Sequence, residues 1–204
     1  MNTIRVLLAD DHALFRRGVA SLLAAETGFE VLGEAANGQQ AVEMTLQLMP
    51  DVILMDISMP VMDGLEATRQ IKAEFPYVRI VILTVSDGER SLFEALKCGA
   101  DGYLPKMIEP RALFDTLRQV AQGEAPVSRL MAARLLQGFA CRAGQPALTA
   151  AHAAELTARE KDVLEQVAQG RSNQQVATAL AIPESAVNDH LRHILENLHL
   201  GTRV

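Results

Sequence analysis

The first 122 residues alternate five times between a short apolar run and a longer stretch whose apolar side chains recur at helical spacing. The strand-like runs occupy residues 4–9, 30–35, 52–55, 79–84 and 102–105. The helix-like stretches occupy residues 13–25, 38–48, 64–74, 87–98 and 110–121. Five such units predict an α/β domain whose parallel sheet is covered by helices on both faces. Right-handed crossovers favour the flavodoxin-like strand order 2-1-3-4-5.

Polar side chains stand where four of these apolar runs end. Asp10 and Asp11 follow the first run, and Asp56 follows the third. Thr84 ends the fourth run, and Lys106 follows the fifth. The carboxyl ends of parallel strands meet at one edge of the sheet, where open α/β sheets bind their ligands. We therefore expect three carboxylates, a hydroxyl and an ammonium group in one crevice.

This set of groups suits the transfer of a phosphoryl group. Adjacent carboxylates are costly unless a cation neutralises them, and Mg²⁺ prefers oxygen ligands. Asp56 would be both a metal ligand and the nucleophile that forms an acyl phosphate. The metal and Lys106 would stabilise the charge on the transferring oxygens, and Thr84 could donate a hydrogen bond to one of them. Each residue alone is more often a solvated turn or strand residue, so the prediction rests on the ordered set.

A break at residues 123–126 ends this pattern, and the remainder predicts helices only. A short helix is expected over residues 128–138, and the stretch 141–154, with Gly144, Pro146 and six alanines, is typical of a linker. The predicted division of the chain is an α/β domain at 1–124, a linker with a short helix at 125–154, and a smaller all-α domain at 155–204.

The all-α domain shows a helix-turn-helix pattern. Thr157 and Glu160 form a capping box that opens one helix, and Ser172 caps a second helix. A third helix, over residues 185–198, has its apolar side chains on one face. Residues 151–204 carry 7 acidic and 5 basic side chains, a net charge of −2, although nucleic-acid-binding domains usually show a basic surface.

The α/β domain resembles the receiver domain of two-component response regulators. The matching motifs are Leu-Ala-Asp-Asp-His at 8–12, Leu-Met-Asp-Ile-Ser-Met-Pro at 54–60, Asp-Gly at 63–64, Leu-Thr at 83–84 and Gly-Ala-Asp-Gly-Tyr-Leu-Pro-Lys at 99–106. The resemblance implies that Asp56 accepts phosphate from a sensor histidine kinase. It implies that Asp11, Asp56 and the carbonyl of Ser58 bind Mg²⁺, with Asp10 assisting. It also implies that Thr84 and Tyr103 form a switch pair, and that His12 is a bystander.

A turnover enzyme is the rival class for such a site. Aspartyl-phosphate hydrolases usually place a second Asp two residues after the nucleophile, and this chain has Ser58 there. We therefore expect self-phosphorylation and slow self-dephosphorylation at Asp56, and no catalytic turnover.

The C-terminal domain resembles the LuxR-type helix-turn-helix over about residues 155–201. The matching positions are 156–160, 163–164, 170, 172–173, 176–177, 180, 182, 187, 190–191, 194–195 and 198. Together the two resemblances suggest the NarL/FixJ class, which implies a phosphorylation-controlled transcriptional regulator that dimerises and binds double-stranded DNA. A recognition helix would read base edges in the major groove while other donors hold phosphates. The candidate DNA contacts are Asn188, Asp189, Arg192, His193, Lys161 and Arg171.

The recognition helix departs from the family pattern. Asn188 and Asp189 stand where the family usually carries lysine or threonine; asparagine can pair bidentately with adenine, and aspartate can accept from cytosine. An acidic recognition helix also fits an alternative, a degenerate helix-turn-helix that acts through protein partners. The family normally continues into a further helix, which the sequence to Val204 does not include. A further hypothesis is that the two unphosphorylated domains pack together and cover the recognition helix.

The compartment is predicted from what the chain lacks. No apolar run approaches the roughly 20 residues needed to span a bilayer, and the N-terminus has no signal-peptide pattern. The two cysteines, Cys98 and Cys141, form no metal or disulfide framework. We expect a cytoplasmic protein.

Overall fold

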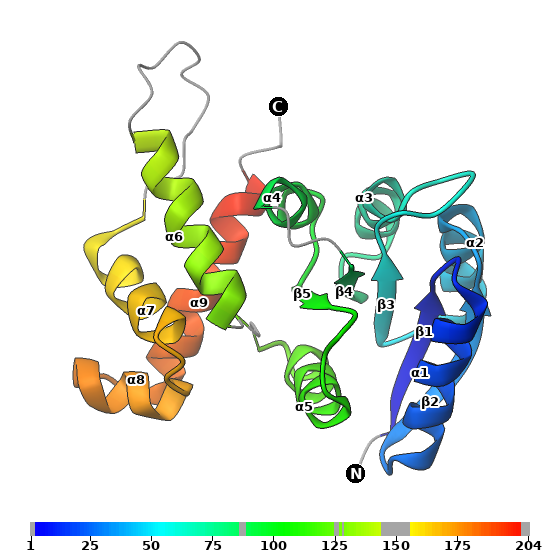
Figure 1. Cartoon of the computed structure of the whole chain (residues 1–204), viewed down its shortest axis with the longest axis horizontal. Helices are drawn as coiled ribbons and strands as arrows, with labels where there is room; N and C mark the ends of the chain where they lie inside the picture. The colour runs from blue at the N-terminus through cyan, green and yellow to red at the C-terminus, as the bar shows by residue number, and fades with distance from the viewer. Residues whose placement is uncertain (1–2, 86–88, 125–126, 128, 144–155, 201–204) are drawn as a thin grey trace.

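In the computed structural model, residues 3–85, 89–124, 127, 129–143 and 156–200 are described. The N-terminal part contains one five-stranded parallel sheet of order β2-β1-β3-β4-β5, which confirms the expected topology (Figure 1). Its strands are β1 (Ile4–Ala9), β2 (Phe29–Ala35), β3 (Val52–Asp56), β4 (Arg79–Thr84) and β5 (Gly102–Pro105). The central strand β3 is buried along its whole length, as a strand covered on both faces must be.

Helices cover both faces of this sheet. They are α1 (Ala13–Ala25), α2 (Gly38–Leu48), α3 (Gly64–Glu74), α4 (Glu89–Lys97) and α5 (Pro110–Ala121). Leu8 and Leu54 pack with residues of α1 and α5, whereas Leu7 and Ile53 belong to the cluster of α2, α3 and α4. This alternation along each strand supports a separate apolar layer on each face. The residue ranges expected from the sequence agree closely; positions 87–88 of the expected fourth helix lie outside the described residues.

The C-terminal part is helical, as expected. Its elements are α6 (Arg129–Ala143), α7 (Ala158–Ala168), α8 (Asn173–Leu180) and α9 (Glu184–Leu200). Helix α6 is longer than the predicted 128–138, so the linker interpretation of residues 141–143 was wrong. No glycine or proline interrupts residues 139–143, and the helix can continue up to Gly144. The rest of the predicted linker, residues 144–154, lies outside the described residues.

The two parts pack against each other through α4. Helix α9 lies against α4, and α6 also contacts α4 (Figure 1). One apolar cluster continues from Leu92 and Leu96 of α4 to Met131 of α6 and Leu191 of α9. The helix with the recognition pattern therefore lies next to the α/β domain. Among the described residues, no helix has both the length and the apolar character that crossing a membrane requires.

Candidate functional site

Asp56 occupies the last position of the central strand, at the carboxyl edge of the sheet. Its carboxylate is almost completely buried, and the backbone N–H of Ile57 donates to Asp56 Oδ1 at 2.9 Å. The strand registers place Asp56 opposite Leu83 of β4, so Thr84 lies one step further along. The site is therefore built at the end of the fully buried central strand.

The Asp63-Gly64 motif holds the loop that follows Asp56. Asp63 caps α3 by accepting from the backbone N–H of Glu66 at 2.8 Å. The N–H of Gly64 donates to the carbonyl of Ile57 at 2.8 Å. A Cβ atom at Gly64 would lie 1.8 Å from the backbone oxygen of Asp56, a hard clash. Glycine is required here because the start of α3 approaches the backbone of Asp56 this closely.

Lys106 reaches both buried acids from the end of β5. Its Nζ atom lies 2.7 Å from Asp10 Oδ2 and 3.0 Å from Asp56 Oδ2, and all three side chains are nearly inaccessible. Burial raises the pKa of Asp56, and the nearby Lys106 opposes that rise while Asp10 adds to it. Burial would lower the pKa of Lys106, but its hydrogen bonds to Asp10 and Asp56 outweigh that effect and raise it. The ammonium group therefore stays charged at neutral pH.

The acidic group has the composition of a divalent-cation site. Ligand atoms of Asp10, Asp11, His12 and Asp56 all lie within 4.8 Å of one another. The carboxylates supply the oxygen donors that Mg²⁺ prefers. The exposed His12 turns its Nδ1 toward Asp11 Oδ1 at 2.8 Å. Ser58, whose carbonyl was expected to be a ligand, is exposed in the loop after β3.

Thr84 and Tyr103 lie on neighbouring strands beside this group. Both are buried, at the end of β4 and on β5. Tyr103 is paired with Ile82, two residues before Thr84, and the N–H of Lys106 donates to the carbonyl of Thr84 at 2.8 Å. The structure thus brings Asp10, Asp11, Asp56 and Lys106 together, and it places Thr84 and Tyr103 on the next two strands of the sheet.

The candidate DNA contacts lie on the helix-turn-helix, but they are not all free. Asp189, Arg192 and His193 are exposed on α9, and Lys161 and Arg171 are exposed on and after α7. The guanidinium of Arg192 lies 3.4 Å from the carboxylate of Asp189, one turn away, so the two charges partly offset each other. Asn188 is half-buried and accepts from Asn173 of α8 at 2.7 Å. Sequence reasoning missed Asn173 because nothing in the local pattern signals a contact across 15 residues.

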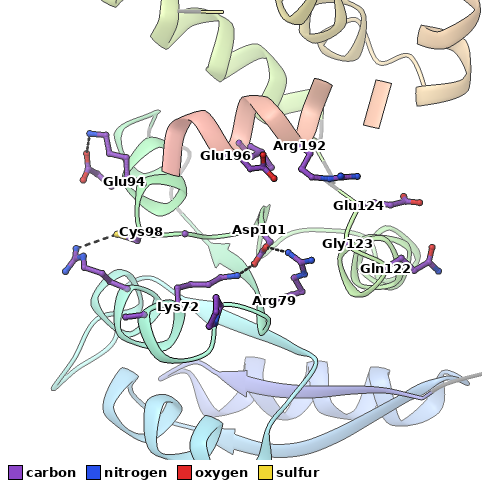
Figure 2. Close-up of a pocket in the computed structure, with 16 residues that line it drawn as sticks. Lys72, Arg79, Glu94, Cys98, Asp101, Gln122, Gly123, Glu124, Arg192 and Glu196 are labelled. Atoms are coloured by element: carbon purple, nitrogen blue, oxygen red, sulfur yellow. Dashed lines mark hydrogen bonds and ion pairs between the residues drawn. The ribbon is translucent and has the colours of Figure 1, made fainter. Parts of the chain in front are cut away.

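Part of α9 also lines a cavity of about 810 Å³ against the α/β domain (Figure 2). Arg192, Leu195 and Glu196 form one wall. The opposite wall includes Asp101, which pairs with Lys72 at 2.6 Å and with Arg79 at 2.9 Å. Arg192 therefore faces the α/β domain in this arrangement, whereas a DNA contact would require it to face outward.

Comparison with known proteins agrees with both halves of the chain. Residues 6–118 match the response regulator receiver domain, and residues 154–204 match the bacterial regulatory proteins of the luxR family. The chain therefore belongs to the response regulators that join a receiver domain to a LuxR-type DNA-binding domain. It is related to the NarL-type regulators, and it is a phosphorylation-controlled DNA-binding regulator of transcription. The comparisons favour this function over the alternative of a helix-turn-helix that acts through protein partners.

The relatives extend over nearly the whole chain. The nitrate/nitrite response regulator protein NarL of Escherichia coli K12 is 41% identical over 199 residues, which cover 98% of this chain and 91% of NarL. The uncharacterized transcriptional regulatory protein YxjL of Bacillus subtilis 168 is 40% identical, with the same coverage. The response regulator ChrA of a heme-sensing two-component system is 32% identical and superimposes with a TM-score of 0.57 over 100% of this chain and 98% of ChrA. A LuxR-family response regulator from Aurantimonas gives a TM-score of 0.62 at 30% identity, over 68% of this chain and 99% of that one.

Proposed function

We propose that Asp56 is the phosphoacceptor and that its phosphorylation by a sensor histidine kinase releases α9 for DNA binding. The observation that carries this proposal is the buried contact of Lys106 with both Asp10 and Asp56. A lysine with two carboxylates at the end of a central strand is placed to stabilise the charge of a transferring phosphoryl group. As a partner of a kinase and of DNA, the protein would act in the cytoplasm.

Each group at the site then has a role in the transfer. An Asp56 carboxylate oxygen attacks phosphorus, the bond from phosphorus to the kinase histidine breaks, and an acyl phosphate forms. Asp10, Asp11 and Asp56 would hold Mg²⁺, which would supply charge neutralisation when bound. The same site, without a positioned second acid at Ser58, supports only slow self-dephosphorylation.

Phosphorylation adds a charge of about −1.5 to −2 and strong acceptor oxygens next to Thr84. The Thr84 hydroxyl would turn toward the phosphoryl group, and Tyr103 would repack behind it. Tyr103 lies on β5, which contacts α4, and it belongs to the apolar cluster that reaches Leu191 of α9. This is a local charge change that biases a two-state contact. Release of α9 would expose the candidate DNA contacts and allow a dimer to form.

An apolar rim around the site fits the docking of a kinase helix. The rim consists of Leu14, Val61, Val85 and Met107, whose exposed fractions of 81–95% exceed those of the other exposed large apolar residues in the described part of the chain. Val61 also has φ of 69°, an unusual backbone conformation for a β-branched residue. Clustered exposed apolar side chains mark interaction sites.

The rim continues as a stripe along α1. Leu14, Gly18 and Leu22 recur at four-residue spacing, and a Cβ at Gly18 would meet nothing within 4 Å. An exposed apolar stripe with a glycine at its centre allows a partner helix to approach closely. We assign the rim and this stripe to the kinase, because the partner must bring its phosphohistidine to Asp56 between them.

The decisive experiment is selection from a random duplex library with full-length protein, with and without beryllofluoride and Mg²⁺. Enrichment of an inverted motif mainly in the activated state, together with dimerisation measured by light scattering, is the expected result. The variant Asp56→Asn should not respond to beryllofluoride. The variant Tyr103→Ala should still accept phosphate but dimerise poorly. The proposal would be contradicted if Asp56→Asn enriched the motif as strongly as activated wild type does, both with and without beryllofluoride.

A further inference from the structure

Two asparagine side chains join the helices of the helix-turn-helix. The Nδ2 group of Asn173 donates to Asn188 Oδ1 at 2.7 Å, a short and well-formed hydrogen bond. Asn173 is the first residue of α8, directly after Ser172, whose capping box fixes the start of that helix. Asn188 follows the fully buried Val187 on α9. Both ends of the amide–amide contact are therefore held by packed or capped backbone.

This contact decides which atoms Asn188 can offer to DNA. A side-chain amide has one acceptor oxygen and one donor NH₂ group in a single plane. Asn173 takes one lone pair of the Asn188 oxygen and holds that oxygen toward α8, so the NH₂ group is the part that Asn188 offers to a partner elsewhere. The pair lines a cavity of about 440 Å³ together with Arg171, whose other wall includes Thr116 and Gln119 of α5. Space for a partner exists once α5 moves away.

We infer that Asn173 is a positioning residue for base recognition, and that it makes Asn188 read hydrogen-bond acceptors. The bidentate contact of asparagine with adenine needs the oxygen turned toward N6 and the NH₂ group turned toward N7. With its oxygen held toward Asn173, Asn188 instead donates to a base edge rich in acceptors. Guanine presents O6 and N7 side by side, so guanine is the expected base at this position. This inference rests on the proposed contact of α9 with DNA and replaces the adenine expected from the residue type alone.

The inference predicts an inversion of base preference. Asn173→Asp has no donor for Asn188 Oδ1, and its carboxylate would accept from Asn188 Nδ2. The amide of Asn188 would then turn over and present its oxygen, which accepts from the amino groups of cytosine and adenine. The added negative charge lowers affinity for every duplex alike, so the ratio between bases is the diagnostic quantity.

The test measures affinities of the activated full-length protein for four duplexes that differ at one base pair. The duplexes derive from the selected motif, and each position of the half-site is varied in turn. Wild type should prefer guanine over adenine about tenfold at one position. Asn188→Ala should lose discrimination there, Asn173→Ala should reduce it to about twofold, and Asn173→Asp should reverse it. Gln174→Ala, which changes an exposed neighbour on α8 that lines the same cavity, should keep the wild-type ratio.

The outcomes distinguish a failure of this inference from a failure of the proposed DNA binding. Failure of activated wild type to bind any duplex would overturn the proposed DNA-binding mode and the inference with it. Specific binding whose base preferences are unchanged in Asn188→Ala would overturn the inference alone. So would a wild-type preference for adenine, or an Asn173→Asp variant that folds normally and still prefers guanine.

Discussion

At the residue scale, Asp56 shows the conflict between stability and reactivity. Its carboxylate is buried beside Asp10, and burial raises its pKa above the ordinary value of 3.8. The folded state therefore holds the proton more tightly than the unfolded state. Stability is lost as pH rises from about 3.8 through the raised pKa, because the folded protein must then bury the charge. Lys106 reduces this penalty but is shared between two acids.

We predict that Asp56→Asn stabilises the protein by about 1–2 kcal/mol at pH 7 in the presence of a chelator. The gain should shrink as pH falls through the raised pKa of Asp56 and should vanish well below 3.8, where the wild-type carboxyl is neutral in both states. Urea unfolding at several pH values measures this difference in unfolding free energy between the variant and wild type. Glu43→Gln, which removes an exposed acid on α2, should change stability little at any pH. A loss of stability in Asp56→Asn at pH 7 would show that the ion pair with Lys106 outweighs desolvation.

The predictable part of the site was the part built from strand ends. Asp10, Asp56 and Lys106 were predicted to meet because each follows an apolar run, and parallel strands bring such positions to one edge. The contact between Asn173 and Asn188 could not be predicted in this way. Neither residue stands at a strand end, and asparagine is compatible with an exposed turn or helix surface at both positions. Contacts between helices depend on packing angles that a single sequence does not encode locally.

At the element scale, α7 depends on a capping box that is partly buried. Glu160 is only 5% exposed, and it accepts from both the N–H and the hydroxyl of Thr157 at 2.9 Å. Thr157→Ala removes a cap and one donor to a buried carboxylate. We expect the C-terminal domain to lose about 2 kcal/mol of unfolding free energy, measured by hydrogen exchange in α7. Ser172→Ala, at the exposed capping box of α8, should cost only about 1 kcal/mol. Equal losses would show that the burial of Glu160 adds nothing.

Helix α1 gives a second test at this scale. If its apolar stripe receives a kinase helix, Leu14→Ser and Leu22→Ser should each reduce kcat/KM for phosphotransfer from the kinase about tenfold, because each removes apolar contact area from the complex. Phosphorylation by a small-molecule donor such as acetyl phosphate should be unchanged, because Asp56 itself is intact. Tyr77→Ser is the matched control, since Tyr77 is an exposed apolar residue that precedes β4, at the opposite edge of the sheet. A tenfold loss with the small donor as well would contradict a docking role.

The boundaries of α1, α2, α3 and α5 were predicted to the residue. Asn37-Gly38 and Asp63-Gly64 mark the starts of α2 and α3, Pro110 opens α5, and apolar spacing alone marks α1. The C-terminal end of helix α6 was not predicted. The helix extends to Ala143 because no glycine or proline ends it between residues 139 and 143, and no residue pattern in the sequence marks this extension. The placement of α9 on α4 had no sequence signal at all. Leu92 and Leu96 of α4 recur at the helical spacing that core residues of the α/β domain also show, so the sequence alone does not reveal that their cluster extends to α9.

At the scale of the whole molecule, phosphorylation and DNA binding act on the same equilibrium. This equilibrium is between a closed arrangement, in which α9 packs on α4, and an open arrangement, in which α9 is released. The closed arrangement turns Arg192 toward the receiver domain, and a DNA-bound arrangement cannot keep it there. A phosphoryl group that favours opening must therefore raise DNA affinity. By linkage, DNA must raise the affinity for the phosphoryl analogue by the same factor, about 5- to 150-fold for an ordinary allosteric coupling.

A charge reversal in the closed contact should weaken this coupling. Glu94 and Arg192 line the same cavity from α4 and α9, toward different ends of it, and Glu94→Lys adds positive charge to a lining that already holds Arg192 and Lys97 (Figure 2). We predict higher DNA affinity for the unphosphorylated variant, and less tightening of beryllofluoride binding by duplex, followed through the ¹⁹F signal of the bound fluoride. Glu43→Lys makes the same charge change on α2, away from the interface, and controls for general attraction to DNA. If both variants gain DNA affinity equally and retain the full coupling, the packing of α9 on α4 does not control access to DNA.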